Sequence, residues 1–216
     1  MGELTFEQAV ACFKEQAVAL AEGGAQVLWI ETMSANEEVA AAAEAAKSTG
    51  LPVVGCLTFD TARRSMMGVT PSEFAAFAVE IGLDAVGSNC GIGPAELMDS
   101  TTQLLEANCG LPIAAKGNCG IPQYVDGAIH FHGSPELMAD YALFARDAGA
   151  TIIGGCCGTT PEHLAAMVTA LNVTAPRPFD AAIMTEVLGA PWPDFSERAA
   201  SEGGRRSRRR SVGRAD

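Results

Sequence analysis

A chain of 216 residues, 48% of them hydrophobic, is long enough to bury one substantial core. Residues 1–202 hold 25 acidic and only eight basic residues, so this body repels phosphate backbones and nucleic acid is not an expected partner. No apolar run is long enough to span a membrane and the N-terminus lacks a signal-peptide pattern, so we expect a cytoplasmic protein without membrane contact.

Helix starts are marked by Ser, Thr and Pro along the chain. Three Ser or Thr residues precede Glu or Gln by three positions, the spacing of a capping box: Thr5 with Gln8, Ser34 with Glu37, and Thr70 with Glu73. Three prolines directly follow Ser or Thr, as expected for an N-cap before Pro at the first helical position: Pro71, Pro135 and Pro161. Helices are predicted to begin at these places.

Five short apolar runs separate the predicted helices and are typical of buried strands. They cover residues 26–30, 52–57, 85–87, 112–115 and 151–153. Strand and helix alternate about five times, which predicts parallel strands with right-handed crossovers. The spacing fits either an open doubly wound sheet or part of a (β/α)8 barrel, whose eight units need about 250 residues.

The strand and helix pattern ends near Leu171. We therefore expect residues 1–172 to form the α/β domain, followed by a proline-containing extension at 173–216 that ends in a disordered, arginine-rich tail. The first predicted element is a helix rather than a strand, which suggests a fragment or a misassigned start. Because about five units cannot close a barrel, we expect exposed strand edges and self-association.

The cysteines carry the strongest chemical signal. Seven cysteines in a cytoplasmic chain indicate free thiols or a metal site rather than disulfides. Cys156 and Cys157 are adjacent and follow the last predicted strand, between Gly155 and Gly158. Neighbouring side chains in a regular strand point to opposite faces, but the glycines let the backbone leave that geometry. Both sulfurs can then face the C-terminal edge of the sheet, where α/β proteins place their sites.

A catalytic zinc site usually has three protein ligands and one open position, so a third ligand must come from another strand end. Three Asn-Cys-Gly triplets offer one, at Cys90, Cys109 and Cys119. Gly110 is typical of the residue that follows a helix, which would leave Cys109 in a last helical turn at the opposite edge. Cys90 and Cys119 both follow predicted strands. The residues alone leave both as candidates, with a modest advantage for Cys90 from its neighbouring glycines.

Three segments resemble the signature blocks of the homocysteine S-methyltransferase family, which includes betaine-homocysteine methyltransferase and the homocysteine-binding module of cobalamin-dependent methionine synthase. The segments are Glu31-Thr32-Met33, Gly87 to Gly91 and Gly154 to Pro161. The resemblance runs from about Leu4 to Leu171 and implies an α/β fold, a partial (β/α)8 TIM barrel with about the last five β/α units. The glycine-rich Asp-Gly block of the family's first strands has no counterpart here.

The resemblance also implies the chemistry. It makes Cys90, Cys156 and Cys157 the ligands of Zn²⁺ and leaves Cys119 as a neighbour. The implied reaction is zinc-dependent methyl transfer to the thiol of homocysteine, which gives methionine. The alternative hypothesis is a truncated, non-catalytic zinc-binding homologue or a structural module.

Two further residues are assigned to the substrate. The resemblance implies that Glu31 holds the ammonium group of homocysteine, and we expect Asn89 to form a hydrogen bond near the same site. The three histidines have no ligand spacing with the cysteines and are interpreted as surface or structural residues: His130, His132 and His163.

The sequence identifies the methyl donor less clearly than the metal ligands. Animal-type betaine enzymes of the family have an aromatic residue directly after the glutamate, where this chain has Thr32. Only 6% of the residues are aromatic, so a full aromatic cage for a quaternary ammonium is not expected. A methylcobalamin-bearing partner, either a corrinoid protein or a corrinoid domain, fits better, while betaine and methylsulfonium donors stay open.

Overall fold

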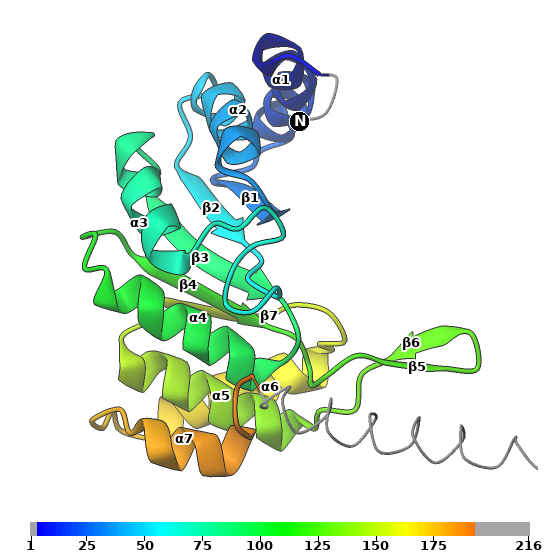
Figure 1. Ribbon diagram of the computed structural model, residues 1–216, viewed down its shortest axis with the longest axis vertical. Helices are drawn as coiled ribbons and strands as arrows, with labels where there is room; N and C mark the ends of the chain where they lie inside the picture. Colours follow the sequence, from blue (N-terminus) through cyan, green and yellow to red (C-terminus); the bar gives the residue numbers. More distant parts are fainter. Residues whose placement is uncertain (1–3, 193–216) are drawn as a thin grey trace, which may run out of the picture.

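Residues 4–192 are described by the computed structural model, in which strands alternate with helices along most of the chain (Figure 1). The helices are α1 (Phe6–Glu22), α2 (Asn36–Lys47), α3 (Pro71–Glu80), α4 (Pro94–Glu106), α5 (Pro135–Ala148), α6 (Pro161–Val173) and α7 (Ala181–Leu188). The strands are β1 (Leu28–Met33), β2 (Val53–Leu57), β3 (Ala85–Cys90), β4 (Ile113–Gly117), β5 (Gln123–Val125), β6 (Ala128–His130) and β7 (Ile152–Gly155). None of the helices in this range is both long and apolar enough to cross a bilayer.

Five parallel strands form one sheet in the order β1-β2-β3-β4-β7 (Figure 1). This order follows the sequence without reversal, whereas a doubly wound sheet reverses its order at a switch point. The topology is therefore that of consecutive barrel units, and the predicted partial TIM barrel is confirmed. Within residues 4–192 the sheet stays open, with β1 and β7 as its two edges.

The two faces of the sheet differ in what covers them. Side chains such as Ile30, Val53 and Ile113 pack beneath the helices in a large apolar cluster. The other face, called the inner face below, carries the alternate residues of each strand. Its buried apolar cluster is small, with short side chains such as Cys56 and Ala114 at its centre, and Trp29 and Ile152 of the two edge strands pack against it. Short side chains on this face leave room for longer polar ones near the strand ends.

The predicted helix starts are largely confirmed. Thr5 and Thr70 form complete capping boxes, and Pro71, Pro135 and Pro161 each stand at the start of a helix behind a Ser or Thr N-cap. The capping box at Ser34 is wrong, because α2 begins at Asn36 with Ala35 as its N-cap. The carbonyl of Ser34 instead accepts a 2.6 Å hydrogen bond from Ser65, so a tertiary contact holds this residue outside the helix.

The expected position of Cys109 also needs correction. Helix α4 ends at Glu106, and Asn108 rather than Gly110 takes the first left-handed conformation after it, with φ of 47°. Asn tolerates this conformation well. Cys109 consequently lies in the following loop, partly buried against the large apolar cluster, and not in a last helical turn.

A hairpin of two strands and one helix were not predicted from the sequence. Strands β5 and β6 form a hairpin that projects away from the sheet, with Asp126 and Gly127 at positive φ in its turn (Figure 1). An Asp-Gly pair is a strong signal for such a turn and could have revealed it. Helix α7 lies within the extension and packs against α5 with its buried Met184. The arginine-rich tail and its predicted disorder lie outside the described residues.

We predict that the chain self-associates, because β1 and β7 present unpaired backbone groups at the two edges of the sheet. Light scattering coupled to size exclusion should give a mass above that of one chain, and the mass should fall on dilution. A monodisperse monomer at high protein concentration would contradict this expectation.

Candidate metal centre

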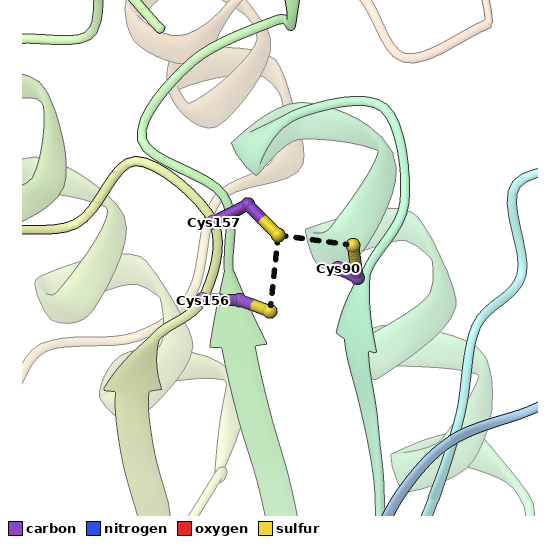
Figure 2. A group of neighbouring side chains, drawn as sticks. All are labelled: Cys90, Cys156 and Cys157. Atoms are coloured by element: carbon purple, nitrogen blue, oxygen red, sulfur yellow. Dashed lines mark hydrogen bonds between the residues drawn. The ribbon is translucent and has the colours of Figure 1, made fainter. Parts of the chain in front are cut away.

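Three cysteine side chains converge at the C-terminal edge of the sheet. Cys90 ends β3, while Cys156 and Cys157 follow β7, and their sulfurs all lie within 4.8 Å of one another (Figure 2). The Sγ atom of Cys157 is 3.7 Å from that of Cys90 and 4.0 Å from that of Cys156. The centre is partly open to solvent, since Cys157 is exposed and the other two are half-buried.

Unusual backbone geometry brings these side chains together. Cys90 has φ of 60°, a left-handed conformation that interrupts the alternation of the strand just where it ends. On the other segment, a Cβ atom at Gly155 would lie 2.3 Å from Thr159, and one at Gly158 would lie 2.4 Å from Phe131. Only glycine fits these two positions, so the glycines around the paired cysteines allow the tight loop.

The buried side chain of Asn118 joins the two cysteine segments. It lies at the end of β4, between β3 and β7, and is 1% exposed. Its Oδ1 accepts a 3.1 Å hydrogen bond from the backbone N–H of Cys157, and its Nδ2 donates a 2.8 Å bond to the carbonyl of Gly91. Asn118 was not among the predicted site residues, although its Asn-Cys-Gly triplet at a strand end was the available signal.

Asn89 connects the cysteine centre to β1. Its Oδ1 accepts a 3.0 Å hydrogen bond from the backbone N–H of Thr32, and its Nδ2 donates to Thr32 Oγ1 at 2.7 Å and to Cys156 Sγ at 3.8 Å. Thr32 has φ of 62°, a conformation that is rare for a β-branched residue and costs on the order of 1–3 kcal/mol. The buried amide of Asn89 therefore holds a strained residue beside Glu31.

The thiol of Cys119 does not belong to the group of three sulfurs. This thiol donates a 2.9 Å hydrogen bond to the carbonyl of Gly133 and lies 2.9 Å from Nε2 of His163. His163 is buried, and its Nδ1 accepts a hydrogen bond from the backbone N–H of Thr160 at the start of α6. The backbone N–H of Cys119 donates a 2.9 Å hydrogen bond to the carbonyl of Cys157, but it is the sulfur of Cys90 and not that of Cys119 that joins the paired cysteines. His163 has a structural position, whereas His130 and His132 are exposed.

The three thiols hold their protons unequally. The pKa of Cys156 is lowered to about 5, first by a hydrogen bond from the Cys90 thiol and further by the amide of Asn89. The same hydrogen bond, together with burial, raises the pKa of Cys90. The sulfur of Cys156 is therefore readily ionised. Its negative charge opposes ionisation of the other two thiols. A bound cation would remove that opposition, and thiolates are ligands that Zn²⁺ favours.

Glu31 lies on β1, and its carboxylate forms an ion pair with Lys116 of β4. The ammonium group of Lys116 also lies 5.0 Å from the ring centroid of Trp29. Lys116 was not among the predicted site residues. A lone lysine near the end of an otherwise apolar run, Ile113 to Gly117, was the available signal.

Residues 1–171 match the sequence profile of the family described as homocysteine S-methyltransferase. The chain belongs to this family. The resemblance carried by the Glu-Thr-Met, Asn-Cys-Gly and Cys-Cys blocks is thereby confirmed.

Individual relatives agree with this membership. The chain is 27% identical to a methionine synthase of Mycobacterium leprae over 188 residues and 30% identical to one of Mycobacterium tuberculosis over 176 residues. These alignments cover 82% and 76% of the chain but only 16% and 14% of the two relatives. The apo form of the homocysteine methyltransferase MmuM from Escherichia coli superposes with a TM-score of 0.61 at 26% identity, covering 78% of this chain and 59% of that one.

We predict that Asn118→Ala weakens Zn²⁺ binding by about ten- to a hundredfold, the usual effect of removing a group that orients metal ligands. The change deletes both hydrogen bonds between the cysteine segments. Competition with a chromogenic chelator measures the affinity, and circular dichroism checks the fold. The matched control is Asn172→Ala, at an exposed position of α6, which should bind Zn²⁺ like the parent. Parental affinity in Asn118→Ala would contradict the assigned role.

Proposed function

We propose that this chain carries the zinc centre of a methyltransferase that transfers a methyl group to the thiol of homocysteine and forms methionine. The proposed ligands of Zn²⁺ are Cys90, Cys156 and Cys157. The observation that carries the proposal is the convergence of these three sulfurs at the C-terminal edge of a barrel-type sheet. Membership of the homocysteine S-methyltransferase family supports the reaction.

The spacing of the sulfurs suits the metal. With a Zn–S distance of about 2.3 Å, two sulfurs of a tetrahedral site lie about 3.8 Å apart. The distances of 3.7 and 4.0 Å from Cys157 to its two neighbours are close to that value. Three protein ligands leave a fourth position for a substrate atom, as in catalytic rather than structural zinc sites.

The reaction needs a thiolate nucleophile at a pH where free thiols are mostly protonated. Zinc would supply a Lewis acid that replaces the thiol proton of homocysteine. The three cysteine thiolates would leave the centre with a net charge of −1, which keeps an added sulfur electron-rich. Glu31 would bind the ammonium group of the substrate, and Asn89 would hold the Thr32 backbone and Cys156 in place beside it.

The proposed methyl donor is a methylcobalamin-bearing protein or domain. The resemblance to the homocysteine-binding module of cobalamin-dependent methionine synthase supports this donor. Thr32 follows Glu31 at the position where animal-type betaine enzymes have an aromatic residue, which argues against betaine as the methyl donor. Betaine and methylsulfonium compounds are the donors to compare.

A second candidate function is metal binding without turnover. The three-cysteine centre would by itself suffice for this function. The two candidates share the same metal ligands, and they differ in whether methionine is formed.

We predict about one Zn²⁺ per chain, lost on substitution of any of the three ligands by Ser. Metal analysis of the purified parent and of Cys90→Ser, Cys156→Ser and Cys157→Ser tests the ligand set. Cys119→Ser is the matched control and should keep its zinc, since Cys119 is bonded to Gly133 and His163. Full zinc content in Cys156→Ser, or zinc loss in Cys119→Ser alone, would refute the assignment.

We predict that the zinc-loaded chain forms methionine from homocysteine and methylcobalamin, and forms little with betaine or S-methylmethionine. Mass spectrometry of the product with each donor is the measurement, with Cys156→Ser reduced to the uncatalysed rate. Zinc binding without methionine from any donor would instead support the second candidate.

A further inference from the structure

Lys116 is the one Lys or Arg residue on the five strands of the parallel sheet. It pairs in register with Asn89 of β3 on one side and with Gly154 of β7 on the other. A Cβ atom at Gly154 would lie 3.4 Å from Cγ and 3.8 Å from Cε of Lys116. The lysine stem therefore passes within van der Waals distance of the side-chain position of Gly154 on the inner face.

The ion pair between Lys116 and Glu31 spans the inner face rather than joining neighbouring strands. β1 and β4 are separated by β2 and β3, so a flat sheet would place them about 14 Å apart. Two long side chains meet across this width, above the short side chains of the inner cluster. The ammonium group of Lys116 also lies over the Trp29 ring, which helps to fix its position.

The pair lies in the same neighbourhood as the cysteine centre. Asn89, the register partner of Lys116, donates to the sulfur of Cys156. Cys56 is fully buried on the same face. Its pKa is raised to about 12, mainly by burial and next by the negative charge of Glu31. Cys156 adds a smaller rise, while the positive charge of Lys116 lowers the pKa. These charges are close enough to act on one common thiol.

We propose that Lys116 binds the α-carboxylate of the substrate amino acid while Glu31 binds its ammonium group. This inference rests on the proposed function, because it places the headgroup of homocysteine beside its zinc-bound thiol. In the free protein the two side chains neutralise each other. A zwitterionic headgroup offers each of them a new partner of opposite charge, so both charges stay paired when the ligand enters.

The exposure of the pair suits such an exchange. The side chain of Lys116 is 24% exposed and that of Glu31 is 32% exposed, so a ligand can reach both while solvent screening is reduced. Charge-assisted hydrogen bonds of this kind are stronger than neutral ones. The site is thereby specific for amino acids that carry both charged groups, and not for simple thiols.

A purely structural lysine would behave differently. If Lys116 only oriented Glu31, its removal would weaken every ligand that carries an ammonium group. If it binds the carboxylate, its removal weakens only ligands that carry a carboxylate. It also releases Glu31 from a competing partner, so an amine without a carboxylate should bind as well as before or more tightly. For a ligand with an ammonium group but no carboxylate, the orienting role therefore predicts weaker binding to the variant, and the carboxylate-binding role predicts equal or tighter binding.

The experiment measures dissociation constants by isothermal titration calorimetry with zinc-loaded protein and three thiols. L-homocysteine carries both groups, 3-aminopropanethiol lacks the carboxylate and 4-sulfanylbutanoate lacks the ammonium. In Lys116→Met the affinity for homocysteine should fall about ten- to a hundredfold, while that for 3-aminopropanethiol stays constant or rises. In Glu31→Gln the affinity for homocysteine should fall similarly, while that for 4-sulfanylbutanoate stays constant or rises.

Controls separate this inference from the zinc assignment. Zinc content is measured for each variant, and Lys14→Met, at an exposed position of α1, should bind all three thiols like the parent. Equal losses of homocysteine and 3-aminopropanethiol in Lys116→Met would overturn the inference and leave the zinc centre intact. If the parent holds no zinc, the proposed function fails. The same comparison then uses L-methionine, 3-(methylthio)propylamine and 4-(methylthio)butanoate, and an unchanged methionine affinity in Lys116→Met would overturn the inference there.

Discussion

The buried amide of Asn118 ties together two chain segments that are 66 residues apart at their cysteines, and the cysteine centre depends on that tie. Parallel pairing of β3, β4 and β7 brings the strand ends to one edge, and a backbone hydrogen bond from Cys119 to Cys157 joins the segments that follow β4 and β7. Asn118 gives one hydrogen bond to the loop after Cys90 and receives one from Cys157. An unpaired buried amide would cost about 1–3 kcal/mol, so the loops are held in the one arrangement that satisfies it.

Two residues with strained backbone conformations lie at this centre. Cys90 and Thr32 both have positive φ without being glycine, and each stands at the end of a strand. Conformations of this kind persist only where neighbouring contacts determine them fully. For Thr32 those contacts come from Asn89, which occupies both the backbone N–H and the side-chain hydroxyl of the residue. The same amide reaches Cys156, so the strained turn and the sulfur are positioned together.

The inner face shows how side-chain size determines where charges can lie. Cys56, Ala85 and Ala114 keep the apolar layer thin, and Gly154 adds no side chain beside Lys116. Lys116 can therefore reach across the sheet to Glu31 instead of turning into solvent. In a chain with a formal net charge of −12, one lysine at this position balances a carboxylate close to a cluster of thiols. Larger residues in the same layer would block this arrangement.

Local sequence determined much of this protein. Thr70 and Pro71 mark a helix start because capping needs only neighbouring residues, and five apolar runs with helices between them indicate parallel strands. The Cys-Cys pair between glycines indicated a candidate metal-binding loop for the same local reason. Only the tertiary structure decided that the sulfur of Cys90 rather than that of Cys119 joins the paired cysteines, that Asn118 links the cysteine segments, and that Lys116 pairs with Glu31. These contacts link residues tens of positions apart, and they follow from strand order and register, which no short stretch of sequence specifies.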